Sequence, residues 1–139
     1  MNTQFLQSLV GYNARRAALF IIEGFLERMA EFDLRPVDFS VMSVIHHNPG
    51  ITSRQLCAAL ALLPPNLVGL IQSLEERGMV LRQRHPHDGR ALRLYPTPVG
   101  GAIMVQAEQA VSDLEVARTR KLTPAQRNTL MQLLQKIYL

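Results

Sequence analysis

Arginine side chains gather in one short stretch of this sequence, and their chemistry suits a partner that carries phosphates. Residues 77–93 hold five arginines and one acid, Asp88, in a chain of 139 residues with a formal net charge of +4. The five are Arg77, Arg82, Arg84, Arg90 and Arg93. Guanidinium groups bind phosphates through a planar fork of donors and release counterions from a polyanion. Considered alone, such a run also fits a solvated, arginine-rich hairpin.

The basic stretch falls on two segments that are predicted to be extended. Residues 79–84 and 90–95 read as strands, and the residues between them, His85-Pro86-His87-Asp88-Gly89, are typical of a turn. The sequence therefore predicts a two-stranded ribbon with a basic tip, at which His87 faces phosphate or solvent.

Two short helices are predicted directly before this ribbon. Thr52 and Gln55 have the spacing of a capping box, which predicts a helix that runs to Leu60. Residues 61–63 then connect it to a second helix over residues 64–78, which starts with two prolines and ends at a glycine. Its inward stripe is Leu67, Leu70, Ile71 and Leu74. Helix, tight turn, helix and ribbon in this order predict a winged helix-turn-helix, a position in which the basic ribbon is expected to face nucleic acid.

The outward face of the second helix is polar but carries no cation before Arg77. The residues expected there are Pro65, Asn66, Gly69, Gln72 and Ser73. The commonest direct contact with guanine is therefore missing, whereas the amides of Asn66 and Gln72 suit adenine edges. The candidates for phosphate contacts are Ser53, Arg54, Arg82 and Arg84.

Helical patterns flank the winged region on both sides. A helix over about residues 3–32 is apolar nearly all round at its centre and would be about 45 Å long, so part of it should pack on a second subunit. A short helix then ends at about His47, and a long helix starts at Thr97-Pro98. The last helix starts at residues 123–126, a second capping box, and is expected to bury one apolar stripe. That stripe is Leu130, Leu133, Leu134 and Ile137.

These elements define a mainly α fold with a small β-hairpin, built as a winged helix-turn-helix with N- and C-terminal dimerisation helices. We predict that residues 1–34 and 98–139 form the helical dimerisation region and residues 35–97 the DNA-binding region, within one intertwined domain. The chain is 47% hydrophobic and 19% charged, which excludes disorder along most of its length.

Cysteine content and hydropathy limit the class of protein further. Cys57 is the single cysteine, so an intrachain disulfide and a cysteine-based zinc site are excluded, and core packing is the favoured role of its thiol. The longest apolar stretch, residues 17–22, is too short to span a membrane, and the N-terminus lacks the pattern of a signal peptide. We expect a cytoplasmic protein without a membrane partner.

The motifs in combination resemble the MarR family of regulators over nearly the whole chain. The matching residues are Ile51-Thr52-Ser53-Arg54-Gln55-Leu56, Leu74-Glu75-Glu76-Arg77-Gly78-Met79-Val80 before Arg82, Asp88-Gly89-Arg90, and Leu122-Thr123-Pro124. The resemblance implies a triangular dimer formed by the first and last helices, with the helix over 64–78 in the major groove. It also implies that Arg90 enters the minor groove and that Asp88 holds its guanidinium there.

A small-molecule effector is a further implication of the resemblance. Tyr12, Arg15 and Arg16 resemble a stretch found in family members that sense aromatic acids, and one arginine could hold a carboxylate bidentately. His46 is a further ligand candidate. The alternative is that both arginines are solvated or form salt bridges between subunits.

No metal and no cofactor is expected. His46 and His47 are the one pair that invites a metal site, but neighbouring residues on a helix point about 100° apart, so the two are not expected to share an ion.

These observations predict a ligand-responsive transcriptional regulator, in the first place a repressor, that binds a pseudo-palindromic duplex DNA operator as a homodimer. The alternative is a winged-helix module that binds another protein without reading DNA. No grouping of nucleophile, base and orienting residue is found, so an enzyme is not expected.

Overall fold

A computed structural model describes residues 1–84, 87 and 91–139 of the chain, and helices dominate it. In chain order the elements are α1 (Gln4–Gln7), α2 (Val10–Met29), η1 (Ala30–Phe32), α3 (Pro36–His47), β1 (Ile51–Thr52), α4 (Ser53–Leu60), α5 (Pro64–Glu76), β2 (Val80–Arg84), β3 (Leu92–Pro96), α6 (Pro98–Arg118) and α7 (Pro124–Tyr138). The predicted class, mainly α with a small β element in a winged helix-turn-helix, is confirmed.

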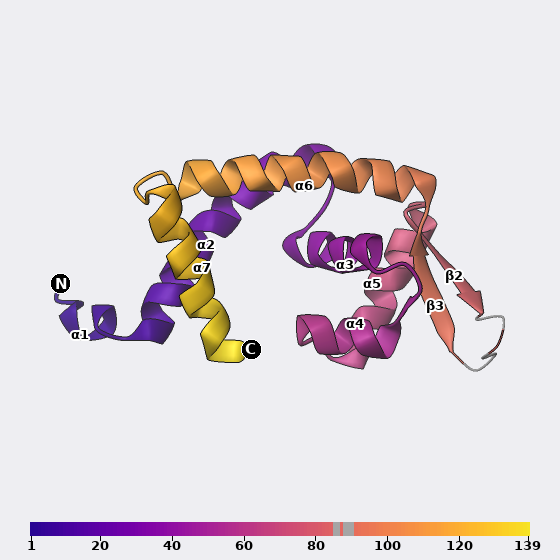
Figure 1. Cartoon of the computed structure of the whole chain (residues 1–139), viewed down its shortest axis with the longest axis horizontal. Coiled ribbons are helices and arrows are strands. Elements are labelled where there is room, and N and C mark those ends of the chain that lie inside the picture. Colours follow the sequence, from indigo (N-terminus) through magenta and orange to yellow (C-terminus); the bar gives the residue numbers. More distant parts are fainter. Residues whose placement is uncertain (85–86, 88–90) are drawn as a thin grey trace.

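Helix α6 joins the two ends of the molecule (Figure 1). Helix α2 packs along it, and α3 packs against the same helix from the winged end. The winged end holds α3, α4, α5 and the sheet, whereas α1, the start of α2 and α7 lie at the opposite end together with both termini (Figure 1). The elements predicted to bind DNA and those predicted to dimerise are thus separated along α6.

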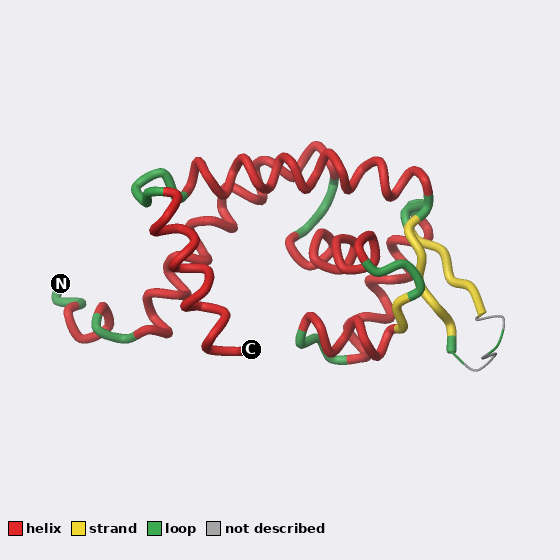
Figure 2. The backbone as a smooth tube through the Cα atoms, in the orientation of Figure 1, coloured by secondary structure: helices red, strands yellow, loops and turns green. Residues whose placement is uncertain are grey.

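The sheet has three antiparallel strands in the order β1-β3-β2, rather than the two predicted (Figure 2). Leu94 on the central strand is paired with Ile51 on one side and with Arg82 on the other. Strand β1 has only two residues, which are too few to show the alternation of apolar and polar side chains that predicts a strand from sequence. Gly50 positions it: this glycine has φ +89°, and its N–H donates to the carbonyl of Leu94 at 2.8 Å.

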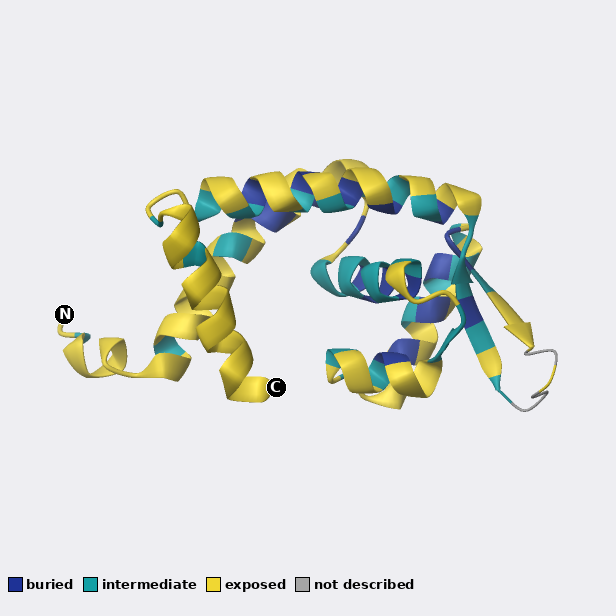
Figure 3. Cartoon of the chain, in the orientation of Figure 1, coloured by how far each residue is buried: buried dark blue, intermediate teal, exposed yellow. Residues whose placement is uncertain are grey.

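The hydrophobic core lies where α6 packs on α3 and β3, and it extends into α4, α5 and β2 (Figure 3). Further buried members come from the facing sides of α2 and α6. The fully buried side chains include Met29, Val41, Met42, Ile45, Leu56, Leu74, Met104 and Ala107. This core holds the winged helix-turn-helix against α6, which positions the two regions relative to each other.

The predicted first helix over residues 3–32 is interrupted, which corrects the sequence-based expectation. Leu9 has an extended backbone with ψ 128°, so α1 ends before it and α2 begins after it. The Nδ2 group of Asn13 donates to the carbonyls of both Gln7 and Leu9 at 2.8 Å. The bond to Gln7 satisfies a carbonyl that a continuous helix would pair with a backbone N–H, whereas the Leu9 carbonyl also accepts from the Asn13 N–H at 3.2 Å; together these bonds stabilise the break.

Gly100 lies in the first turn of α6, where this helix meets the chain just before β2. A Cβ atom built on Gly100 would lie 2.1 Å from the carbonyl oxygen of Met79. The same junction is tied by Thr97, whose N–H donates to the carbonyl of Met79 at 3.0 Å and whose hydroxyl donates to that of Gly78 at 2.6 Å. Because the blocking atom belongs to the backbone, any side chain at position 100 must push α6 away from β2.

We expect Gly100→Ala to lower the free energy of unfolding by about 1 to 3 kcal/mol, because the added methyl group overpacks this junction. Gly101→Ala is the matched control, since its Cβ would meet only the His46 ring, at 3.7 Å. Alanine favours a helix over glycine by about 1 kcal/mol, so the control variant should be as stable as the wild type or more stable. Urea denaturation measures both variants, and equal losses in the two would contradict the tight junction.

Arg35 and Asp38 form a paired cap at the start of α3. The backbone N–H of Arg35 donates to Oδ2 of Asp38 at 3.1 Å, and its guanidinium donates to both carboxylate oxygens at 2.8 and 2.9 Å. Burial raises the pKa of the Asp38 carboxyl, but the hydrogen bonds and charge of Arg35 outweigh burial and hold that pKa below its ordinary value of 3.8.

Asp38→Asn is expected to lower the free energy of unfolding by about 1 to 3 kcal/mol near neutral pH, because it removes a charge-assisted pair. A carboxyl with a depressed pKa stabilises the fold above its unfolded-state pKa and loses that effect as pH falls through the folded-state pKa. The difference in Tm between the wild type and the variant should therefore persist down to about pH 5 and shrink below about pH 4. A difference that stays constant through this acid range would refute the role of the ionised carboxylate.

Apolar side chains are exposed at the end of the molecule that holds both termini. The stripe expected to be buried in the last helix is exposed within one chain: Leu130 by 41%, Leu133 by 55%, Leu134 by 37% and Ile137 by 67%. Two exposed residues of α2, Val10 and Phe20, each line a hollow together with Leu130, and Phe5 of α1 is exposed as well. Such a large apolar surface is typical of a contact with another subunit.

Within the described residues no single helix has the length and apolar content to cross a membrane. Only α4 and α5 taken together, across a bend of 113°, meet that test of length and composition.

Candidate nucleic-acid interface

Helices α4 and α5 form the expected helix-turn-helix. The capping box at the start of α4 is present: the Gln55 N–H donates to the Thr52 hydroxyl at 3.3 Å, and the Thr52 N–H donates to the Gln55 side chain at 3.0 Å. Helix α4 ends at Leu60 and is followed by Ala61, which has φ +51°, and the N–H of Leu62 donates back to the Cys57 carbonyl at 3.0 Å. This tight turn produces the 113° bend between the two helices.

Helix α5 presents one face to solvent and one to the core. Leu67, Ile71 and Leu74 are buried, as the spacing predicts. On the other face Pro65, Asn66, Gly69 and Gln72 are exposed, whereas Ser73 is half-buried and lies at the edge of that face. The residues proposed to read bases therefore lie together, except that Ser73 is less accessible than expected.

The phosphate-contact candidates from two different elements surround the start of α5. Ser53 and Arg54 in the first turn of α4 and Arg82 on β2 line one hollow of about 290 Å³, together with Pro64 and Val68 of α5. The N-terminus of a helix carries free N–H groups and a positive end of the helix dipole, so Ser53 and Arg54 occupy a favourable place for an anion. The fold thus places positive groups from α4 and from β2 around one hollow beside α5.

The arginines near α5 differ in whether they already have an ion-pair or hydrogen-bond partner within the chain. The guanidinium of Arg82 contacts Oε2 of Glu75, with Nε and Nη2 at 2.9 and 2.7 Å, so β2 is tied to the end of α5. Arg54 and Arg84 are exposed and have no hydrogen-bond or ion-pair partner among the residues that the structure describes. Arg54 and Arg84 are therefore more available for phosphate than Arg82, which would have to share its charge with Glu75.

Two arginines of the basic stretch serve the fold instead. Arg77 donates to the carbonyl of Phe32 at 3.1 Å and so ties the end of α5 to η1. Arg93 donates to the carbonyl of Gly50 at 2.9 Å and fixes the turn before β1. Fewer arginines of residues 77–93 are therefore available to bind phosphates than the sequence alone indicates.

The structure adds one residue to the candidate reading face and constrains another. Val68 is 63% exposed on α5 between the positions of Pro65 and Gln72, where an apolar side chain suits the methyl group of thymine. Its helical spacing from those residues is the signal that sequence reasoning missed. The Gln72 amide donates to Glu76 at 3.1 Å, so it must turn away from Glu76 to reach a base.

The tip of the wing is described only in part. His87 is exposed. Asp88 and Arg90, the pair expected at the minor groove, lie outside the residues that the structure describes.

The candidate effector residues fall in two separate parts of the chain. Tyr12 is half-buried and Arg15 and Arg16 are exposed, all three near the start of α2, whereas His46 lies on α3 beside Gly101 of α6. Figure 1 shows that these two places are far apart within one chain.

A groove with mixed apolar and basic lining lies near the start of α7. Its volume is about 620 Å³, and Phe20, Ile21 and Leu130 line it together with Arg120 and Lys121 from the α6–α7 connection. An apolar cavity with cations at its edge suits an aromatic or acyl group that carries an anion.

Known regulators share the sequence pattern of this chain. A model of the MarR family matches residues 32–91, which run from the end of η1 to the residue before β3. A putative transcriptional regulatory protein for the hcr operon of Thauera aromatica is 28% identical over 130 residues, which cover 93% of this chain and 78% of that relative.

Solved structures share the fold over its full length. The transcriptional repressor CouR bound to a 23-mer DNA duplex is 33% identical and matches with a TM-score of 0.92, covering 99% of this chain and 97% of that chain. CouR bound to p-coumaroyl-CoA is likewise 33% identical and matches with a TM-score of 0.86, over 99% and 96% of the two chains.

Proposed function

Because this chain belongs to the MarR family of transcriptional regulators, we propose that it binds an operator in duplex DNA as a homodimer and represses transcription there. The observation that carries this proposal is the exposed face of α5 in a winged region that also exposes Arg54 on α4 and Arg84 on β2. A helix with free polar side chains fits the major groove, and cations beside it fit the two phosphate backbones. The similarity to a repressor bound to DNA supports the same arrangement.

Each part of the interface has a separate task in this proposal. Asn66, Gln72 and Val68 of α5 contact base edges, and Arg54 and Arg84 contact phosphates. Arg90 enters the neighbouring minor groove with its guanidinium held by Asp88. Since α5 contains no arginine or lysine, the shape of the minor groove sensed by Arg90 carries much of the specificity.

Two copies of the chain are needed for this function. The exposed apolar surface of α1, α2 and α7 is the proposed contact between the copies, so residues 1–34 and 98–139 form the dimerisation region and residues 35–97 the DNA-binding region. Two α5 helices related by a two-fold axis then read two half-sites, which explains why a pseudo-palindromic operator is proposed.

The proposed effector is an aromatic acid or its acyl thioester. The apolar groove at Phe20 with Arg120 and Lys121 at its edge supports this class, as does the similarity to CouR bound to p-coumaroyl-CoA. Tyr12, Arg15, Arg16 and His46 remain proposed contacts, supplied from both subunits of the dimer. Coupling of about 1 to 3 kcal/mol between effector and DNA is enough for a switch.

A fluorescence anisotropy titration with the DNA upstream of the gene tests the proposal, with a scrambled duplex of equal length and base composition as control. The upstream duplex should bind more tightly than the scrambled one. Raising salt from about 50 to about 200 mM should weaken the binding of both duplexes, because binding releases counterions from DNA and this release is less favourable at higher salt. Failure to bind either duplex at low salt would favour the rival function, a winged-helix module that contacts another protein.

A further inference from the structure

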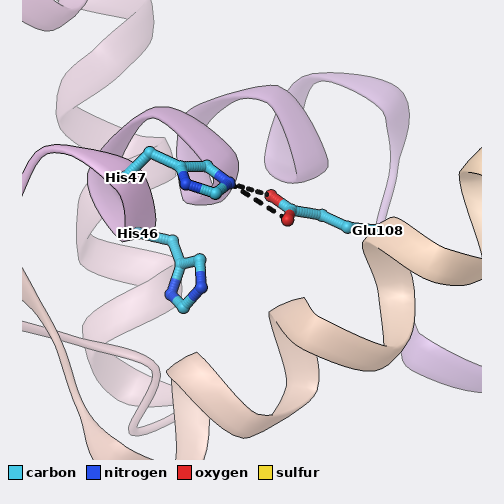
Figure 4. A group of neighbouring side chains, drawn as sticks. All are labelled: His46, His47 and Glu108. Atoms are coloured by element: carbon cyan, nitrogen blue, oxygen red, sulfur yellow. Dashed lines mark hydrogen bonds and ion pairs between the residues drawn. The ribbon is translucent and has the colours of Figure 1, made fainter.

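Three side chains that suit a metal ion meet where α3 packs on α6. His46 and His47 are the last two residues of α3, and Glu108 faces them from α6 (Figure 4). One ligand atom from each of the three lies within 4.8 Å of the others. The rings of the two histidines are 5.0 Å apart and inclined at 74°, so both lie on the side of α3 that faces Glu108 although neighbouring helical residues point about 100° apart.

Glu108 is held in place for this task by groups on α3. The Nε2 atom of His47 lies 2.9 and 3.0 Å from the two carboxylate oxygens of Glu108. The hydroxyl of Ser43 donates to Oε1 at 2.7 Å, which orients the carboxylate from one side. A hydrogen bond of this kind to a carboxylate is the usual support for a metal ligand.

The ring of His46 is not satisfied by the protein. Its Nδ1 atom is buried and has no hydrogen-bond partner among the described residues. A buried polar atom without a partner is uncommon in a folded protein, and no group in the described part of the chain fixes the tautomer of the ring. The imidazole therefore adopts the tautomer that metal binding requires without breaking a hydrogen bond.

We propose that His46, His47 and Glu108 bind one divalent transition-metal ion, with zinc as the best match. Two imidazoles and one carboxylate form a donor set typical of zinc, and three protein ligands leave a fourth tetrahedral position for water. Ligand atoms around zinc are about 3.4 Å apart, so the present distances, none above 4.8 Å, must adjust when the ion binds. The ion displaces the proton shared by Nε2 of His47 and Glu108 and releases it to water, and the His47 side chain is 61% exposed and can move.

The ion would link the winged end of the molecule to α6. Helix α3 belongs to the proposed DNA-binding region and α6 to the proposed dimerisation region, so a metal bridge stabilises the junction between them whether or not DNA is bound. The inference does not depend on the proposed DNA binding, but it assigns His46 to the ion in place of the effector. Its test uses neither DNA nor effector.

Isothermal titration of the full-length, metal-free protein with zinc sulfate tests the site. The wild type should bind one zinc ion per chain, and Glu108→Gln and His47→Asn should each weaken binding at least about tenfold. The matched control is Asp113→Asn, which removes an exposed carboxylate from the same helix outside the cluster and should bind zinc as the wild type does. Zinc should also raise the Tm of the wild type and of the control but not that of either ligand variant.

A second control addresses the two histidines at the wing. The double variant His85→Asn, His87→Asn should bind zinc as tightly as the wild type. Absence of binding by the wild type, unchanged binding by both ligand variants, or loss of binding in the wing variant would each overturn the proposal. Circular dichroism of each metal-free variant separates loss of a ligand from loss of the fold. His47→Asn is the variant least expected to unfold the protein, because the side chain of His47 is 61% exposed.

Discussion

A single charge placed in the apolar stripe of α7 will dissociate the dimer. Leu133 is 55% exposed within one chain, and the proposed interface covers it in both copies. Each Leu133→Glu substitution is expected to cost about 2 kcal/mol of association free energy, so two per dimer weaken the dimer about a thousandfold. Sedimentation velocity over a range of protein concentrations measures the change, and DNA affinity should fall with it because one copy reads only one half-site.

Gln132→Glu is the matched control for this prediction. It introduces the same charge one residue earlier, on the side of α7 opposite to the apolar stripe of Leu130, Leu133, Leu134 and Ile137. This variant should remain dimeric. If Leu133→Glu sediments as the wild type does at low micromolar concentration, the proposed subunit contact is wrong.

Loss of wing arginines will weaken DNA binding by more than tenfold while the protein remains folded. Arg90→Ala removes the proposed minor-groove contact, and Arg84→Ala removes an exposed guanidinium that has no partner among the described residues. The two variants should differ in whether they also lose sequence specificity. Arg84→Ala should weaken all duplexes about equally and lower the slope of log affinity against log salt by about one, whereas Arg90→Ala should also reduce the preference for the operator.

The control for charge alone is Arg28→Ala. Arg28 lies at the end of α2, where it pairs with Glu31, and is no part of the proposed interface. Its loss changes the net charge by the same amount and should leave DNA affinity within about twofold, since surface charges more than a Debye length away are screened. Equal weakening by Arg28→Ala and Arg84→Ala would mean that the wing makes no direct contact.

Local signals in the sequence were enough to predict most of the winged region. The Thr52–Gln55 capping box and the paired prolines at Pro64 mark where α4 and α5 begin, and the apolar spacing of α5 gives its buried face. These features act within one or two helical turns, so they are readable without knowledge of the fold. The capping box at Thr123 predicted the start of α7 for the same reason.

Features that depend on distant residues escaped prediction. Arg77 and Arg93 look like the other arginines in the sequence, yet the carbonyls of Phe32 and Gly50 engage them in the fold. Strand β1 exists only because it pairs with β3, more than forty positions later. The His46–His47–Glu108 cluster likewise depends on the packing of α3 against α6.

The most direct test of the account is hydroxyl-radical footprinting of the operator combined with the mass of the complex in solution. Two protected half-sites should appear, with centres about 10 base pairs or a multiple of that apart, and the complex should contain two chains per duplex. One chain per duplex, or a single protected half-site at saturating protein, would contradict the claim that a homodimer binds the operator through two winged helix-turn-helix regions.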